Sequence, residues 1–197
     1  MSTAALSIHL APIGSLAPAV LAPLARPLAG LFGCDVEISR PSLDPAFAFD
    51  ASRRQFDASK LMLRLLALFP DPRHKVVGVL GEDLFAPCLT WVYGQGQVDG
   101  PAAVVSRHRL DEHFYGRPSS ADAEQRRLLA EIGRQLGHTF GLLHCHDDSC
   151  AMRWSETVEE IEAKGAALCA ACRQKVQRVQ QLRTPITAPV GYAPSHA

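Results

Sequence analysis

The apolar residues of this chain recur with two different periods, which predict alternating strands and helices. Short apolar runs predict strands at residues 5–10, 34–39, 75–80, 89–93 and 102–106. Apolar residues three and four positions apart predict helices at residues 16–32, 57–69, 120–143, 155–166 and 169–183. Strands interleaved with helices indicate an α+β fold, in which a sheet carries helices on one or both faces.

Helix-breaking and capping residues refine the limits of these elements. Pro18 suits the start of the first helix, whereas Pro23 and Pro27 are expected to kink or interrupt it. Ser155 is the expected N-cap of the fourth helix, because acidic residues follow it near the positive end of that helix. Residues 41–51 are expected to form a loop.

Length and composition indicate one folded domain. The chain has 197 residues, of which 47% are hydrophobic, enough for a substantial core. We expect a single domain over residues 1–183, with an N-terminal lobe at 1–141 and a smaller C-terminal part at 142–183, followed by a disordered tail at 184–197. The apolar N-terminal stretch lacks basic residues and is broken by prolines, so neither a signal peptide nor a membrane helix is predicted.

The most informative chemistry lies in the third predicted helix, at residues 134–145, which read R-Q-L-G-H-T-F-G-L-L-H-C. They follow the zinc-peptidase pattern H-E-x-x-H-x-x-G-x-x-H, with His138, Gly141 and His144 in their expected places. In the intact pattern three histidines converge on a zinc ion, and the glutamate acts as general base on the zinc-bound water. Here Arg134 and Gln135 stand where the first histidine and the glutamate belong.

These two departures remove groups that the hydrolytic reaction needs. An arginine side chain has no lone pair for a metal ion and repels it by its charge. A glutamine cannot take a proton at neutral pH, so the general base is missing. We therefore predict impaired catalysis, with His138 and His144 left as a vestigial or weak metal site. Arg134 is expected to pair instead with Glu131 or with the amide oxygen of Gln135.

A catalytic metal would need a replacement ligand, and four side chains are candidates: Glu131, His108, His113 and His146. Glu131 lies two helical turns from His138, about 10 Å along the axis, which is too far for a simple replacement of Arg134. His108 and His113 are expected to be ordinary surface or packing histidines.

Four of the six cysteines follow this helix with the spacing C-x4-C-x18-C-x2-C, at Cys145, Cys150, Cys169 and Cys172. Two close pairs separated by a short segment suit a tetrahedral zinc site made of four thiolates. Free thiols and disulfides are the alternatives, and the absence of a secretion signal disfavours disulfides. His146, within the first pair, is an alternative ligand. Cys34 and Cys88 have no partner spacing and are expected to be buried small hydrophobic residues.

With these motifs the chain resembles the archaemetzincin family of zinc metalloproteases. The resemblance rests on H-C-x4-C-x-M followed by C-x-x-C, and it extends to upstream segments at residues 53–60, 76–87, 91–97, 102–110 and 114–116. It implies a catalytic zinc held by three histidines and a structural zinc held by the four cysteines, with Met152 at the Met-turn position under the catalytic metal. Because residues 134 and 135 depart from the family pattern, no catalytic residue is intact.

The same resemblance implies a mixed, twisted sheet packed by helices, with the site helix below it and a small C-terminal part after Gly141. In that arrangement the strand predicted around residues 91–93 lies near the edge of the sheet. There a peptide can add as an extra strand. Such a peptide-binding cleft would persist after catalysis is lost.

Three functions are compatible with these features. The favoured one is a catalytically impaired metallopeptidase homologue that keeps a structural zinc and a cleft for a peptide or protein segment. The alternative is an active zinc amino- or oligopeptidase with altered metal ligation. A nucleic-acid-binding module would use the basic residues of the last helix, but a net charge of zero argues against nucleic acid and membrane partners. The thiolate-rich site fits a reducing, cytoplasmic location.

Overall fold

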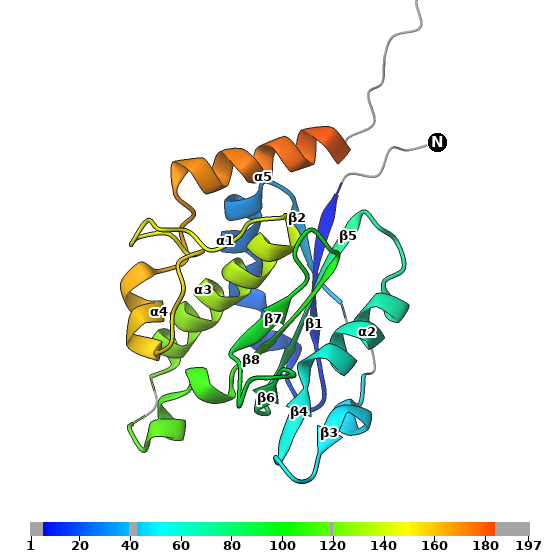
Figure 1. The fold of residues 1–197 in the computed structure, drawn as a ribbon, viewed down its shortest axis with the longest axis vertical. Coiled ribbons are helices and arrows are strands. Elements are labelled where there is room, and N and C mark those ends of the chain that lie inside the picture. The colour runs from blue at the N-terminus through cyan, green and yellow to red at the C-terminus, as the bar shows by residue number, and fades with distance from the viewer. Residues whose placement is uncertain (1–5, 40–42, 119, 184–197) are drawn as a thin grey trace, which may run out of the picture.

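A five-stranded sheet organises the fold. The structure, a computed structural model, describes residues 6–39, 43–118 and 120–183. The strand order is β2-β1-β5-β8-β7, with β1 at Ser7–Pro12, β2 at Asp35–Ile38, β5 at His74–Leu80, β7 at Gly94–Gly96 and β8 at Ala102–Ser106. The first four strands in this order are parallel, and β7 pairs antiparallel with β8 at the edge (Figure 1). A smaller sheet joins β3, β4 and β6, at Phe49–Asp50, Gln55–Asp57 and Leu84–Phe85.

Helices cover both faces of the larger sheet, because its central strands present apolar side chains on both sides. The helices α1 (Ala22–Phe32) and α3 (Ala121–Thr139) pack on one face, against a core that includes Val77 and Val79. The helix α2 (Ala58–Leu68) packs on the other face, against Val76 and Val104. The predicted arrangement of a sheet between helices is therefore confirmed.

Pro18 begins a helical turn as predicted, but Pro23 and Pro27 do not interrupt α1, which runs unbroken from Ala22 to Phe32. A short 3-10 turn at Pro18–Val20 precedes α1, so the segment at 16–32 is interrupted. Pro23 lies in the first turn of α1, where a missing backbone N–H costs nothing, and Pro27 lies inside the helix. The segment expected to be a loop at 41–51 contains a 3-10 turn at Pro45–Ala48 and the short strand β3, with residues 41–42 outside the described ranges.

The prediction of a strand at residues 89–93 is wrong. This segment is a loop with a single bridge between Val92 and Leu84, and the edge strand is β7, which follows it. Two glycines explain the difference, because a Cβ on Gly94 would lie 2.7 Å from the carbonyl oxygen of Val104. A Cβ on Gly96 would lie 2.7 Å from the carbonyl oxygen of Gln135. The glycines allow β7 to pass close to α3. In the sequence, however, a glycine-rich segment indicates a turn rather than a strand.

The C-terminal part adds two helices, α4 (Val158–Lys164) and α5 (Ala170–Arg183), and α5 crosses one end of the molecule beside α1 (Figure 1). The N-cap of α4 is Thr157 rather than Ser155. The Thr157 hydroxyl accepts from the backbone N–H of Glu160, and the Glu160 carboxylate accepts from that of Thr157. This reciprocal capping box satisfies two donors at once, which the acidic residues alone did not reveal. The tail predicted at residues 184–197 lies outside the described residues.

None of the helices in the described ranges is long and apolar enough to cross a bilayer.

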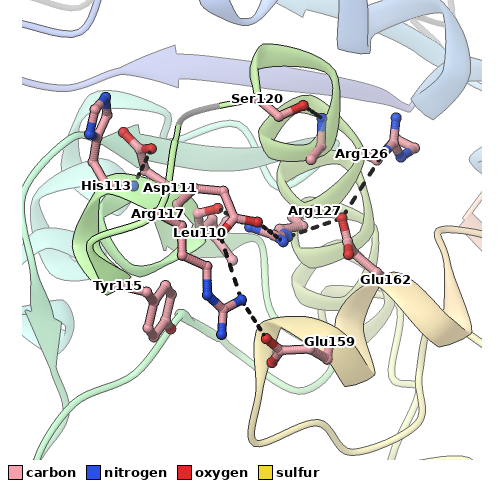
Figure 2. A network of polar contacts seen from close by, with 12 residues as sticks. Leu110, Asp111, His113, Tyr115, Arg117, Ser120, Arg126, Arg127, Glu159 and Glu162 are labelled. Atoms are coloured by element: carbon pink, nitrogen blue, oxygen red, sulfur yellow. Dashed lines mark hydrogen bonds and ion pairs between the residues drawn. The ribbon is translucent and has the colours of Figure 1, made fainter.

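A buried polar network fixes α4 against α3, and Arg127 lies at its centre (Figure 2). This side chain is only 2% exposed and donates to the carbonyl oxygen of Leu110 at 3.0 Å. It also forms ion pairs with Glu112, on the loop before α3, and with Glu162 on α4. Nearby, Arg117 pairs with Glu159 of α4 at 2.9 Å. The network therefore holds three segments in one arrangement.

Replacing Arg127 with methionine is expected to lower the free energy of unfolding by about 3–5 kcal/mol, because Glu112 and Glu162 lose a shared buried partner. Urea denaturation measures this loss. Arg126→Met is the matched control, since its side chain is 67% exposed and lies 4.0 Å from Glu162. Equal stability of the two variants would show that the network does not hold α4 in place.

Candidate functional site

The helix α3 carries the zinc-peptidase pattern and ends where that pattern requires. Ser120 caps its start by accepting from the backbone N–H of Ala123. It ends at Thr139, and Gly141 then reverses the chain with a φ of 81°, a conformation that side chains rarely adopt. The helix therefore ends inside the predicted segment 120–143, before Gly141, and the chain turns back so that His144 returns toward His138.

Arg134 is held by Glu131, one turn earlier in α3. Its Nε donates to Oε2 of Glu131 at 3.0 Å, and its Nη2 donates to Oε1 at 2.7 Å. Gln135 donates to the same Oε1 at 2.6 Å. Burial is the largest single influence and raises the pKa of Glu131, but the Arg134 charge and the hydrogen bonds from Arg134 and Gln135 together hold the pKa below its usual range. The prediction that Arg134 pairs with Glu131 is confirmed, whereas the amide of Gln135 binds Glu131 itself.

His138 and His144 lie close together in a T-shaped arrangement, with ring centroids 5.6 Å apart. The Nδ1 of His138 lies 2.9 Å from the carbonyl oxygen of Leu142, so this nitrogen carries the proton and Nε2 keeps its lone pair. Burial lowers the pKa of both histidines, and the nearby Arg134 charge lowers it further. The ring of His144 also contacts Trp154 edge-on at 4.9 Å.

No third metal ligand accompanies these two histidines among the described residues. In the described ranges, the four cysteines are the only group of three or more histidine, cysteine or carboxylate side chains close enough to share a metal ion. Glu131 is bonded to Arg134 and Gln135, and His146 is exposed. His108 packs edge-on against Phe114, as expected for a packing histidine. The donor set at the ancestral position therefore consists of two imidazoles beside a guanidinium, which does not fit a three-ligand peptidase zinc.

The four predicted cysteines do converge. The sulfur atoms of Cys145, Cys150, Cys169 and Cys172 all lie within 4.8 Å of one another. A tetrahedral zinc with bonds of about 2.3 Å places its sulfurs about 3.8 Å apart. The sulfurs of Cys145 and Cys169 are separated by 3.8 Å, so these residues fit the ion. All six cysteines are free rather than disulfide-bonded.

The remaining cysteines differ from the prediction. Cys88 is exposed rather than buried, because it lies on the surface loop after β6 with a φ of 71°. Cys34 is half-buried at the end of α1 and packs against the main core. Burial raises the pKa of the Cys34 thiol to about 11, which keeps it protonated.

Met152 lies directly under the site helix. Its side chain is fully buried, and its sulfur packs so closely on Gly137 that a Cβ at this point of α3 would displace it. Met152 therefore packs below the turn that carries His138, the place that the Met-turn resemblance implies for it.

Lys75 supports the same end of the helix and was not singled out from the sequence. This lysine is fully buried near the start of β5, directly before the apolar residues of that strand. Its Nζ donates to the carbonyl oxygen of Thr139 at 2.6 Å and to that of Gly100 at 2.9 Å. A cation at the C-terminus of a helix satisfies carbonyl groups that have no partner within the helix. A lysine inside a predicted buried strand is the signal that could have revealed it.

Comparison with known proteins decides the family. A family model described as Peptidase family M54 matches residues 49–178, which include the whole helix motif and all four clustered cysteines. An archaemetzincin of Methanocaldococcus jannaschii is 33% identical over 172 residues, covering 86% of this chain and 92% of that protein. This chain belongs to the archaemetzincin family.

Solved archaemetzincin structures share the fold. The archaemetzincin of Methanopyrus kandleri has a TM-score of 0.77 at 28% identity, covering 90% of this chain and 96% of that one. A zinc-dependent peptidase from Methanocorpusculum labreanum has a TM-score of 0.78 at 26% identity, covering 86% and 99%. The mixed sheet, the helix α3 and the buried cysteine cluster therefore belong to an archaemetzincin scaffold.

Proposed function

We propose that this archaemetzincin has lost zinc-dependent peptide hydrolysis, keeps one structural zinc at its four cysteines, and binds an extended peptide segment at the edge of its sheet. The ion pair between Arg134 and Glu131 carries the first part of this proposal. It places a paired, largely buried cation at the position of the first metal ligand. Gln135, bonded to the same carboxylate, supplies no general base.

The structural zinc is supported by the geometry of the cysteine cluster. Cys150 and Cys172 belong to the main hydrophobic core, so the ion would join the C-terminal part to the rest of the protein. Free thiols in this number fit a reducing compartment such as the cytoplasm.

The peptide-binding role is supported by the position of β7. Among the described residues β7 pairs with β8 alone, so its outer edge presents backbone donors and acceptors to a further strand. Gly96 also lies against His138, with only 3.3 Å between a Cβ placed there and that of the histidine. A segment added to β7 would therefore pass the end of α3, beside the ancestral catalytic position.

One observation favours the alternative of an active peptidase with altered ligation. The bond from His138 to the carbonyl oxygen of Leu142 leaves Nε2 unprotonated, which is the form that binds a metal. His144 lies beside it, so two ligands remain in place for a metal that recruits a third from a substrate or from water.

Metal content and turnover separate the two functions. The full chain, purified without added metal, is expected to contain one zinc per molecule by elemental mass spectrometry and to leave a peptide library uncleaved. A second zinc, together with cleavage that a chelator abolishes and zinc restores, would overturn the proposal in favour of the active peptidase. His138→Ala is the matched variant, since it must abolish such cleavage if the histidines hold the metal.

A further inference from the structure

A pocket lies at the opposite end of the sheet from His138. Lys75, near the start of β5, bonds to the last turn of α3, whereas the residues that follow β5 line a pocket of about 570 Å³. The strand has 7 residues, so about 20 Å separates its two ends. A pocket of this volume is of the size that holds a small molecule.

The topology of the sheet places this pocket at a switch point. After β1 the chain crosses one face of the sheet through α1 to reach β2, and it returns across the other face through α2 to β5. Since β1 and β5 are neighbours, this reversal of strand order places a crevice outside their carboxyl ends. Ser15 follows β1, Glu82 follows β5 and His108 follows β8, and all three line the pocket.

One side of the pocket is fixed by bonds within the protein. Arg109 donates to both carboxylate oxygens of Asp83, at 2.8 Å and 2.7 Å, and Gln55 donates to the same group at 2.8 Å. The Arg109 guanidinium also lies 4.6 Å from the ring centres of both Trp91 and Phe114. These contacts neutralise Asp83 and hold the wall rigid, so this pair needs no ligand.

The other charged groups of the pocket are not balanced in this way. Within the described part of the chain, the buried Oε2 of Glu82 has no hydrogen-bond partner, which is costly for a carboxylate oxygen. Arg53 and Arg54 lie exposed on the turn between β3 and β4 and line the same pocket. Arg53 donates one N–H to the carbonyl oxygen of Leu89 at 3.0 Å and lies over the ring of Phe85, which leaves its other donors for a ligand. The pocket therefore offers one carboxylate, Glu82, to a cationic group of a ligand, and two guanidinium groups, Arg53 and Arg54, to an anionic group.

We propose that this pocket binds a small zwitterion, a free amino acid or a dipeptide, with its ammonium group on Glu82 and its carboxylate on Arg53 and Arg54. Such a ligand satisfies both kinds of group at once. An inorganic phosphate would satisfy the arginines but would bring no donor to Glu82 and would meet its negative charge. The site is separate from the ancestral peptidase position, so it stands or falls independently of the proposed function.

Calorimetric titration of the full, zinc-containing chain tests this assignment with alanine, alanyl-alanine, and the N-acetylated and C-amidated forms of the dipeptide. Either block removes one charged partner, so we expect affinity to fall about 10- to 100-fold for each blocked form. Alanine binding as tightly as the dipeptide identifies a free amino acid as the ligand, and tighter dipeptide binding identifies a dipeptide.

Two variants test whether the dipeptide binds in this pocket. Glu82→Gln keeps the shape of the side chain and removes its charge, and Arg54→Gln removes the charge of one lining arginine. Each is expected to weaken binding about 10-fold or more. Arg64→Gln, on the exposed face of α2, is the matched control and should bind normally. Undetectable binding of every probe, unchanged affinity in Glu82→Gln, or phosphate binding tighter than the dipeptide would each overturn the proposal.

Discussion

Replacing Arg134 with histidine and Gln135 with glutamate in one variant is expected to add a second zinc per chain and to create chelator-sensitive peptidase activity. The new imidazole would complete a set of three with His138, whose Nε2 is already unprotonated, and His144. The new carboxylate would supply the general base. Elemental mass spectrometry and cleavage of a quenched fluorescent peptide library measure the two effects.

The two single variants separate the contributions of ligand and base. Arg134→His alone should bind the second zinc but turn over roughly 10²–10⁴-fold more slowly than the double variant, because the base is still missing. Gln135→Glu alone should remain at one zinc and inactive. A double variant that stays at one zinc would show that features other than these two residues close the ancestral site.

Stability gives the same pair of substitutions an independent readout. Glu131 is fully buried, and without the Arg134 guanidinium its charge loses its main partner. Breaking such a pair costs about 3–5 kcal/mol, so the metal-free double variant should unfold at a markedly lower temperature than the parent chain. Added zinc should then raise the melting temperature of the double variant more than that of the parent.

Local patterns were sufficient for the parts of this protein whose structure depends on neighbours in the sequence. The helix α2 follows the predicted period and is capped by Asp57, whose side chain accepts from two backbone N–H groups. The pairing of Arg134 with Glu131 is a contact within one helical turn. The cysteine spacing also predicted a cluster, because two close pairs of thiols separated by a short segment suit a tetrahedral zinc site.

The features that the sequence could not reveal depend on contacts between segments that are far apart in the chain. The strand β7 contains glycines because α3 passes close to it, and that requirement is invisible until the helix is placed. The pocket at the switch point is lined by residues from four separate segments, so no local sequence spacing predicts it. They include Ser15, Arg54, Glu82 and His108. Lys75 is similar, since the carbonyl group that it binds belongs to Thr139, 64 positions later in the chain.

Replacing Cys172 with serine is expected to release the structural zinc and to lower the melting temperature by roughly 10 °C or more. A structural zinc of this type contributes several kcal/mol to folding, and about 1 kcal/mol shifts the midpoint by about 2–4 °C in a domain of this size. Cys172 is buried in the main core together with Cys150, so loss of the ion should loosen the packing of α5 as well as the loop before it. Trp154, in the same part of the chain, provides a fluorescence readout.

Cys88→Ser is the matched control for this experiment, because Cys88 is exposed and lies outside the cluster. It should keep one zinc and the parent melting temperature. If Cys172→Ser also kept its zinc, the ion would have to reside elsewhere, and His138 with His144 would be the next pair of ligands to replace. Loss of zinc from Cys172→Ser alone would instead assign the single ion to the four thiolates, since serine has the size of cysteine but is a poor zinc ligand.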